Sequence, residues 1–360
     1  MINAFADVSE HCRLSIPAAH QRPVAIVGAG GIVEGAHLPA YARAGVTVVG
    51  ITDLDQERAH RVAAAFAVPR VYASVDELLA DPAVHVVDIA VPVAAQPPIF
   101  RAAIAAGKHV LAQKPFAVDP VTARELAALA DSAGLVAAVN QQMRYDEGIA
   151  AAHRMVELGW IGDVTSFSIT VNLDTPWELW DWAQSMERLE IMVHSIHYHD
   201  VVRWFMGEPE SVYAVGGRTP GQLPIGETRT ISTYRFANGS SALVHANHVN
   251  RGGDNSAEFR IDGVSGAIRG TIGLLYDYPN GRPDTVEVSS RTLPTDGWVP
   301  YPVTQRWIPD AFVGTIGSVL DAIATGKAPR TSALDNVKTV ELVDALYRSM
   351  EENRVVSLAE

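Results

Sequence analysis

The sequence contains only one cysteine, Cys12, so no disulfide can form within the chain and nothing requires an oxidising compartment. The first twenty residues include Asp7, Glu10 and Arg13 and lack a continuous apolar core, which argues against a signal peptide. No run approaches the roughly 20 apolar residues that span a bilayer. We therefore expect a cytoplasmic protein that does not enter a membrane.

Basic clusters are also missing. The chain has 28 Lys and Arg against 41 Asp and Glu, a formal charge of -13, and no block of basic residues. Binding to a phosphate backbone depends on such a patch, so no nucleic-acid partner is expected. The share of hydrophobic residues, 48%, is ordinary for a globular enzyme, and 360 residues favour two domains.

The first half of the chain alternates short β-branched runs with alanine-rich runs. Strands are predicted at 24–28, 46–51, 84–91, 108–112 and 135–139, and helices near 37–44, 55–67, 75–80, 95–106 and 119–133. Continuously apolar strands separated by helices indicate a parallel sheet covered on both faces. This pattern predicts an α/β Rossmann dinucleotide-binding domain over residues 23–145, after an N-terminal extension of residues 1–22.

The pattern changes after residue 145. Helices at 146–158 and 188–206 bracket the strand VTSFSITVNL, and the strands SVYAVGG, TRTISTYRF, SALVHANHV, AEFRIDG and TVEVSS follow. Asn238 and Gly239 form a strong hairpin signal between two of them. Helices near 310–325 and 332–351 close the chain. We expect an α+β domain with a large, mostly antiparallel sheet over residues 146–360, which binds substrate and forms oligomers.

A glycine-rich turn follows the first strand. Gly28, Gly30, Gly31 and Ile32 lead into a helix, where backbone N–H groups can meet a pyrophosphate. The third glycine of the full GxGxxG pattern is replaced by Val33.

An acidic residue follows the second strand. Asp53 lies where a carboxylate accepts hydrogen bonds from the adenosine ribose and repels a 2′-phosphate. The cofactor predicted from this position is NAD, with NADP less favoured.

The run Gln113, Lys114, Pro115 ends another predicted strand. A lysine fixed between a strand end and a proline, downstream of the glycine turn, is placed to serve the reactive end of the nucleotide. This position indicates redox chemistry on an alcohol.

With these features the chain resembles the glucose-fructose oxidoreductase, inositol dehydrogenase and rhizopine catabolism family (Gfo/Idh/MocA). The matching stretches include VAIVGAGGIVEGAHLPAY, GKHVLAQKPFAVD and HSIHYHDVVRWFMGEP. The family's EKP signature implies that Lys114 contacts the nicotinamide ribose and the substrate hydroxyl, while Gln113 replaces the glutamate. The bond before Pro115 is often cis in such proteins. Pro92 fits a turn beneath the nicotinamide.

A second family motif, DxxxH, implies that His197 handles protons, but its acid position is occupied by Val193. Residues three or four apart share a helix face, so His194 or Asp200 could assist instead. A metal site built from neighbouring histidines is not expected, because no carboxylate has clear ligand spacing with them.

Candidate substrate contacts follow from position and residue type. Trp177, in a segment that holds three tryptophans, could stack on a sugar ring and Asn172 could bind its hydroxyls; core packing is the alternative. The resemblance also implies substrate contacts for Arg144 and Tyr145, with a hinge between domains as the alternative. Lys114, His194 and His197 complete the predicted substrate site.

The resemblance implies an NAD-dependent dehydrogenase that acts on a CH–OH group of a sugar, polyol, inositol or sugar acid, with Lys114 and His197 handling the hydroxyl proton. One alternative is an enzyme that keeps NAD tightly bound and recycles it. Another is a non-catalytic NAD-binding regulator, which Val193 favours and the retention of Lys114 and His197 opposes. A homodimer or homotetramer is implied as well.

Overall fold

The computed structural model describes residues 4–276, 278, 281–294 and 296–358. It contains two compact units. The parallel-sheet unit comprises Leu14–Tyr145 and Ile308–Glu341, and the large-sheet unit comprises Met1–Arg13, Asp146–Trp307 and Leu342–Glu360. The boundary after residue 145 coincides with the expected one. In addition, Met1–Arg13 belongs to the large-sheet unit and Ile308–Glu341 to the parallel-sheet unit, which the expected boundaries did not include. The expected division into functional domains stays a prediction.

The parallel-sheet unit contains a five-stranded sheet in the order β2-β1-β3-β4-β5, with every pairing parallel. Its strands are β1 (Val24–Val27), β2 (Val48–Thr52), β3 (Val86–Ile89), β4 (His109–Ala112) and β5 (Ala137–Val139). The helices between them are η2 (Val33–His37), α2 (Leu38–Ala44), α3 (Gln56–Ala65), α4 (Val75–Ala80), η3 (Val93–Ala95), α5 (Gln96–Ala105) and α6 (Pro120–Ser132). The predicted Rossmann fold is confirmed.

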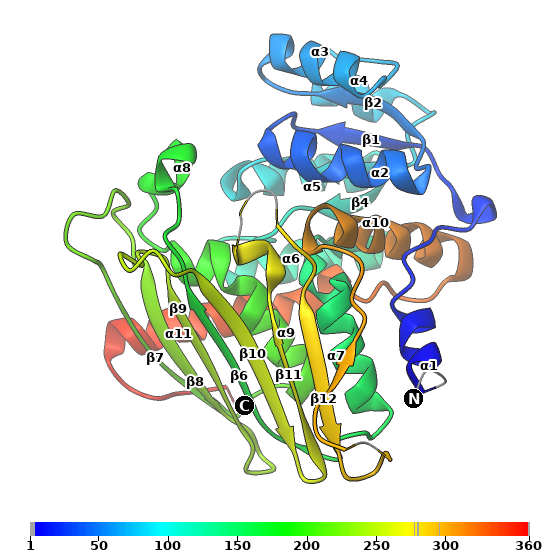
Figure 1. Ribbon diagram of the computed structural model, residues 1–360. Helices are drawn as coiled ribbons and strands as arrows, with labels where there is room; N and C mark the ends of the chain where they lie inside the picture. Colours follow the sequence, from blue (N-terminus) through cyan, green and yellow to red (C-terminus); the bar gives the residue numbers. More distant parts are fainter. Residues whose placement is uncertain (1–3, 277, 279–280, 295, 359–360) are drawn as a thin grey trace. The chain divides into compact units, whose positions relative to one another are not determined.

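Helices cover both faces of this sheet, because alternate residues of each strand point to opposite sides (Figure 1). Ala25 and Val27 of β1 pack in one apolar cluster with residues of α4, α5 and α6. Val24 and Ile26 pack in a second cluster with residues of α2, α3 and α10 (Trp307–Thr325). This second face therefore depends on a helix that is distant in sequence.

Helix α10 was not expected to meet the criteria for a membrane span. By length and composition it is apolar enough to cross a bilayer, but 61% of its most apolar stretch is buried within the protein. Phe312 and Ile316 of α10 are fully buried in the second cluster. These contacts explain its hydrophobicity, because a core helix needs apolar residues around much of its surface.

The large-sheet unit contains a nine-stranded sheet in the order β13-β12-β11-β10-β6-β9-β8-β7-β14. Only the pairing of β6 with β9 is parallel, so the predicted mostly antiparallel sheet is confirmed. Its strands are β6 (Val164–Asn172), β7 (Ser211–Gly217), β8 (Arg229–Arg235), β9 (Ser241–Asn247), β10 (Ser256–Gly263), β11 (Gly266–Thr271), β12 (Thr285–Ser290), β13 (Val299–Tyr301) and β14 (Val356–Ser357).

Helices α7 (Glu147–Glu157) and α9 (Ile196–Met206) lie against one face of this sheet (Figure 1). The unit also contains α1 (Ala4–His11), α8 (Asp181–Gln184), η5 (Trp177–Leu179), η6 (Glu190–His194) and η7 (Gly273–Tyr276), and the division between units falls within α11 (Ala333–Glu352). Gly239, with φ of 83°, makes the predicted hairpin between β8 and β9.

Several elements differ from the prediction, which lacked α1, α8, β11, β13 and β14. Strand β11 was missed because its glycines disfavour a strand, yet a Cβ on Gly270 would lie 2.1 Å from the carbonyl oxygen of Thr285. The helix expected over 188–206 is two elements, since a π-helix ends at His194 before α9 begins. The break separates the two candidate site histidines.

Candidate active site

The glycine turn lies at the carboxyl end of β1. Gly28 has φ of 108°, and a Cβ there would lie 2.3 Å from the carbonyl oxygen of Ala90, so only glycine fits. A Cβ on Gly30 or Gly31 would meet nothing within 4 Å, so the backbone there is open to an approaching group. Ile32 is 37% exposed, whereas Val33 is fully buried in the core. Open N–H groups before a helix fit a pyrophosphate.

Asp53 lies just beyond β2 and is joined to the glycine turn. Its carboxylate accepts the backbone N–H of Ala29 at 2.6 Å, the N–H of Asp55 at 2.8 Å and the guanidinium of Arg58 at 2.7 Å. Desolvation opposes ionisation, but the bond from Arg58 and those from the backbone outweigh it and lower the pKa of Asp53. A carboxylate held ionised here suits a ribose diol and repels a phosphate.

Lys114 lies just after β4, with a cis peptide bond to Pro115. Two glutamine side chains hold this segment. The Gln113 side-chain oxygen accepts the backbone N–H of Lys114 at 2.8 Å, and Gln96 donates to the carbonyl of Pro115 at 3.0 Å. The Lys114 side chain is half-buried, and desolvation lowers its pKa to about 8. A lysine with this pKa can both accept and release a proton near neutral pH.

The turn after β3 also takes part in this half of the site. Pro92 precedes η3, and the N–H of Ala90 donates to the carbonyl of Val27 at 2.8 Å. The N–H of Gln113 reaches back to the carbonyl of Ile89 at 2.9 Å. Gly28, Pro92 and Lys114 therefore follow three adjacent parallel strands, at the sheet edge where ligands bind in such folds.

His194 and His197 lie in the large-sheet unit. His197, in the first turn of α9, is 5% exposed and lies edge-on to Trp307 at 5.2 Å between ring centroids. His194 ends η6 and is half-buried, with its ring 5.1 Å from Trp177 and 4.6 Å from His248. The structure thus brings together His194 and Trp177, two residues predicted to bind substrate.

Val193, which occupies the acid position of the DxxxH motif, and Asp200, which could assist His197 instead, are both buried. Val193 is 6% exposed, and Asp200, 1% exposed, forms an ion pair with Arg203 at 3.7 Å. Arg203 also pairs with Glu208 at 2.6 Å. Asp200 therefore contributes to a charge network within and beyond α9.

The sequence prediction missed a buried carboxylate, Glu190. It is 0% exposed, lies 3.4 Å from the ring of His248, and accepts hydrogen bonds from Ser195 at 3.0 Å and from Thr230. Desolvation would raise the pKa of Glu190, but the bonds from His248 and Thr230 outweigh it, so the pKa lies below its usual value. An ionised carboxylate lies next to the ring that contacts His194.

The spacing of Glu190 could have revealed it. Glu190 and His194 repeat the acid-xxx-histidine spacing of the family motif, three residues before Val193 and His197. His248 had no such signal, because it follows β9 and meets Glu190 only through folding. Among the described residues, no group of three or more His, Cys, Asp or Glu side chains could hold a metal ion.

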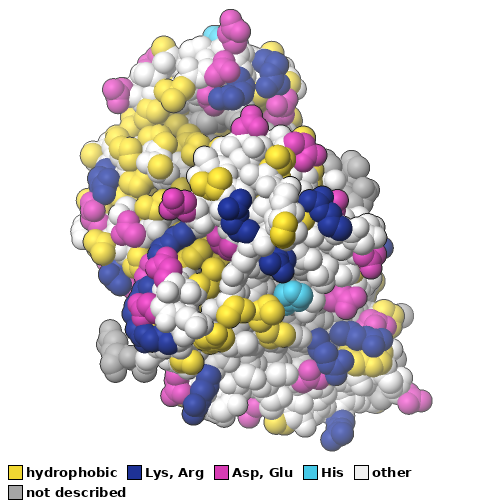
Figure 2. All heavy atoms as spheres, turned by 90° about the vertical axis from the view of Figure 1, so that its left-hand side faces the viewer, with side chains coloured by type: hydrophobic (Ala, Val, Ile, Leu, Met, Phe, Trp, Pro, Cys, Tyr) yellow, Lys and Arg dark blue, Asp and Glu magenta, His cyan; other side chains and the backbone are white. Residues whose placement is uncertain are grey.

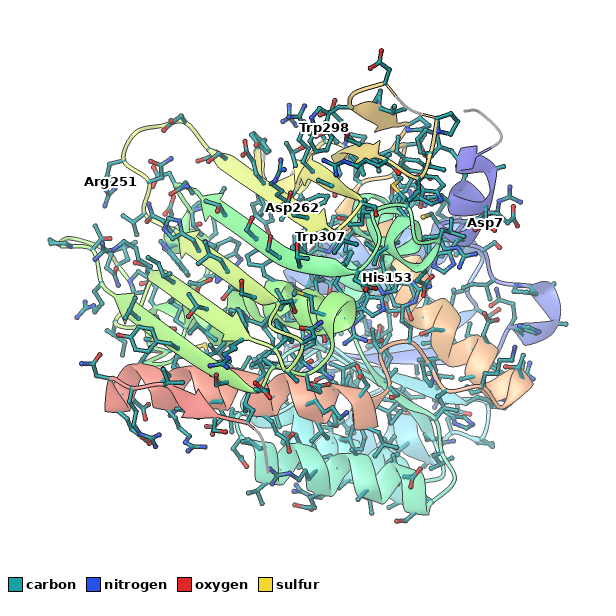
Figure 3. All side chains as sticks on the ribbon, turned by 90° about the horizontal axis from the view of Figure 1, so that it is seen from below. Asp7, His153, Arg251, Asp262, Trp298 and Trp307 are labelled. Atoms are coloured by element: carbon teal, nitrogen blue, oxygen red, sulfur yellow. The ribbon has the colours of Figure 1, made fainter. Side chains whose placement is uncertain are left out.

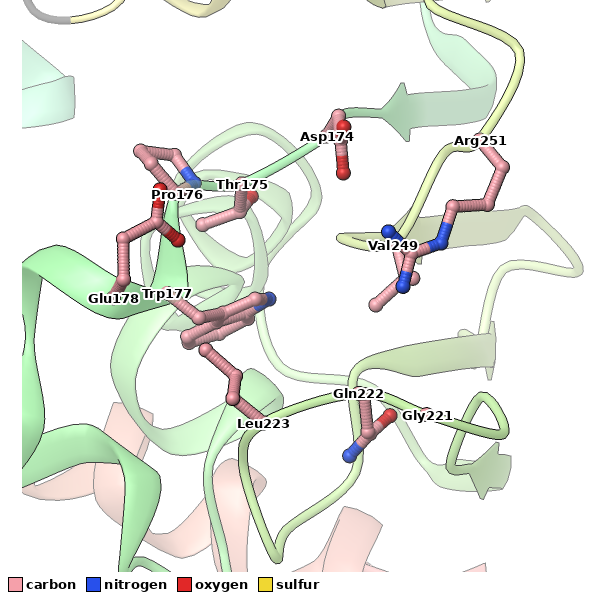
Figure 4. A pocket seen from close by; sticks show the side chains of 10 residues that line it. All are labelled: Asp174, Thr175, Pro176, Trp177, Glu178, Gly221, Gln222, Leu223, Val249 and Arg251. Atoms are coloured by element: carbon pink, nitrogen blue, oxygen red, sulfur yellow. The ribbon is translucent and has the colours of Figure 1, made fainter.

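A pocket of about 380 Å³ lies beside Trp177, whose ring contacts His194 and His248 (Figure 4). Trp177 and Leu223 line one side, Arg251 and Val249 lie opposite, and Asp174 comes from the segment after β6. Trp177 is 4% exposed and donates its indole N–H to the carbonyl of His248 at 3.1 Å. Asn172, at the end of β6, pairs with Asn247 of β9.

Arg144 and Tyr145 have contacts within the parallel-sheet unit. Arg144, 4% exposed, pairs with Asp335 at 2.8 Å and donates to the carbonyl of Arg330 at 3.1 Å. The guanidinium of Arg330 lies 4.7 Å from the centre of the Tyr145 ring. A Cβ on Gly314 would lie 2.4 Å from that ring. These contacts connect the segment after β5 to α10 and α11.

The fold and the glycine turn define a dinucleotide-binding protein. A family model described as "Oxidoreductase family, NAD-binding Rossmann fold" matches residues 22–141, and the GFO/IDH/MocA C-terminal domain model matches residues 149–269. The chain belongs to the GFO/IDH/MocA family of NAD-binding oxidoreductases. The resemblance stated from the sequence is confirmed.

Several named relatives are sugar dehydrogenases, and others are trans-1,2-dihydrobenzene-1,2-diol dehydrogenases. D-apiose dehydrogenase of Paraburkholderia graminis is 27% identical over 323 residues, which cover 87% of this chain and 84% of that protein. D-xylose 1-dehydrogenase (NADP(+)) 2 of Haloferax volcanii is 27% identical over 347 residues, which cover 92% and 98%. The fold is shared with an Agrobacterium radiobacter oxidoreductase solved with NAD+, L-tartaric acid and magnesium, with a TM-score of 0.84, 23% identity, and coverage of 94% of this chain and 98% of that one.

Proposed function

We propose that the chain is an NAD-dependent dehydrogenase that oxidises a hydroxyl-bearing carbon of a sugar, polyol, inositol or sugar acid. The observation that carries this proposal is Lys114, whose desolvation holds the pKa near 8 at the end of β4. Bound NAD supplies the acceptor for the hydride that leaves the substrate carbon. Lys114, in its neutral form, accepts the hydroxyl proton through its Nζ.

The residues around the cofactor support NAD. The open backbone at Gly30 and Gly31 admits the pyrophosphate, and Asp53 presents an ionised carboxylate to the adenosine ribose. A 2′-phosphate would meet that negative charge. The H. volcanii relative is named for NADP(+), so the choice between the two cofactors follows from this chain's own residues.

The substrate class is proposed from the large-sheet unit and from the named relatives. Trp177 packs against His194 and lines a pocket that also contains the carboxylates of Asp174 and Glu178 and the guanidinium of Arg251. Aromatic faces suit the C–H face of a sugar ring, and the polar groups suit its hydroxyls. His197 is proposed as the second residue that handles the hydroxyl proton, from the family motif.

NADH formation tests this function directly. The purified chain is incubated with NAD and a panel of aldoses, polyols, inositols and sugar acids, D-apiose and D-xylose included, and NADH absorbance is followed. Lys114→Arg is the matched inactive control, because arginine keeps the positive charge but does not lose its proton. We expect turnover with at least one compound, and a rate lower by about 10² or more in the control. No turnover with any compound, together with specific binding of NAD, would favour the non-catalytic regulator.

We also propose that the chain forms a homodimer or homotetramer through the outer face of the nine-stranded sheet. Alternate residues of β8 are exposed on this face, including Ile231 at 43%. Trp298, labelled in Figure 3, lies 4.2 Å from the guanidinium of Arg269. On the face shown in Figure 2, basic and acidic side chains are interspersed. Light scattering that shows a monomer at micromolar concentration would contradict this proposal.

A further inference from the structure

A buried polar chain lies behind Gln113 in the parallel-sheet unit. It begins at Asp88 of β3 and His37 of η2, which are both 0% exposed. The Nδ1 of His37 lies 2.6 Å from the Asp88 carboxylate, and the Tyr41 hydroxyl donates to the same oxygen at 2.7 Å. Two donors thus compensate a carboxylate far from solvent, as the burial of a charge requires.

The hydrogen bonds of this chain determine where the His37 proton lies. The backbone N–H of Lys114 donates to the side-chain oxygen of Gln113, which fixes the orientation of that amide. The Gln113 NH₂ group then faces the Nε2 of His37 at 3.1 Å, and the NH₂ of Asn140 faces the same nitrogen at 3.3 Å. An NH₂ group only donates, so Nε2 accepts and the proton is on Nδ1, directed at Asp88.

The identity of residue 113 therefore selects the charge of His37. A glutamate there, as in the EKP signature, would present an acceptor to Nε2. His37 would then have to carry protons on both nitrogens and lie as a cation between two carboxylates. Gln113 instead lets a neutral imidazole complete the chain. The replacement of the motif glutamate by Gln113 is thus matched in the core by a neutral His37 ring that accepts its hydrogen bond.

We propose that His37 is a positioning residue for Lys114. Its neutral ring, anchored by Asp88, holds Gln113, and Gln113 in turn holds the backbone of Lys114. The proposal rests on the function given above for Lys114, but it concerns the placement of the amine, which can be measured without substrate. A displacement of about 1 Å in such a group can lower a rate by about 10².

The composition makes the amine accessible to spectroscopy. The chain has four lysines, Lys108, Lys114, Lys327 and Lys338. Reductive ¹³C-methylation of the full-length protein gives few signals, and Lys114→Met assigns one of them. The pH titration of that signal measures the environment of the Lys114 amine, with and without added NAD.

Two substitutions of His37 form a matched pair. His37→Gln can accept from Gln113 and donate to Asp88, whereas His37→Leu can do neither. We expect the Lys114 signal of His37→Gln to titrate with that of the wild type, well below an ordinary lysine. In His37→Leu the titration moves up toward the ordinary lysine value, and turnover falls while NAD affinity is unchanged.

A further variant keeps the test decisive if His37→Leu does not fold by circular dichroism. Gln113→Met breaks the same link but leaves His37 to pair with Asp88, and it should move the Lys114 titration in the same direction. If the variants that fold lower the melting temperature but leave the Lys114 titration unchanged, His37 is only structural and the proposal is overturned. If the titration moves but Lys114→Arg retains turnover, the proposed function fails and the positioning role stands.

Discussion

The burial of Lys114 predicts a specific pH dependence of sugar oxidation. With a pKa of about 8, about a tenth of the Lys114 side chains are neutral at pH 7. At the ordinary lysine pKa of about 10.5, only about one in 3,000 would be neutral. Desolvation therefore increases the reactive form about 300-fold at pH 7. The value of kcat/KM for the sugar should rise about tenfold between pH 7 and 9 and then level off.

The assay is NADH formation at saturating NAD over this pH range. Lys114→Arg should lower kcat/KM by about 10² or more and abolish the rise, because its guanidinium stays protonated. Lys108→Met is the matched control at the opposite end of β4. Lys108 is 8% exposed and donates to the carbonyls of Asp81 at 2.9 Å and Val84 at 2.8 Å, so its loss should affect stability but not the pH profile.

The same shift has a consequence for stability. Because the folded state lowers the pKa of Lys114, it binds the proton less tightly than the unfolded chain, and stability increases as pH rises from about 8 to about 10.5. Lys114→Met should therefore raise the free energy of unfolding at pH 7, by up to about 3 kcal/mol. A flat pH profile, turnover in Lys114→Arg and no gain in stability would together refute the assignment.

Three other substitutions test the remaining charged groups. Burial raises the pKa of Asp284 to about 6, so Asp284→Asn should stabilise the protein by up to about 3 kcal/mol at pH 7 in urea unfolding. The gain should vanish below pH 4, where Asp284 is protonated in both the folded and the unfolded state. An equal gain at both pH values would contradict this cause. Glu190→Gln breaks a buried pair with His248 and should lower the free energy of unfolding by about 3 kcal/mol at pH 7. The loss should be smaller in acid, because the lowered pKa of Glu190 confines its contribution to higher pH. Wild-type stability of this variant would exclude the pair as a source of stability. Asp53→Asn should shift the ratio of NAD to NADP affinity toward NADP by about tenfold, measured by fluorescence titration; an unchanged ratio would remove Asp53 from cofactor selection.

Local patterns in the sequence determined the nucleotide half of this protein. The strands and helices alternate along the chain in the order that gives a Rossmann sheet. The glycine turn, Asp53 and Lys114 each follow one of these strands, and the carboxyl ends of adjacent parallel strands meet at one edge of the sheet. Period-two alternation also predicted most of the second sheet. It failed at β11, where the need for glycine comes from the carbonyl of Thr285 on the neighbouring strand.

Only the tertiary structure decided the buried polar contacts. His37, Asp88 and Gln113 belong to different elements, and Glu190 and His248 are 58 positions apart, so no spacing along the chain links them. Such groups are paired because an isolated buried charge or polar group is costly, and folding selects the partner by position in space. The sequence thus identified Lys114, whereas the folded structure showed that its amine is desolvated and what holds its backbone.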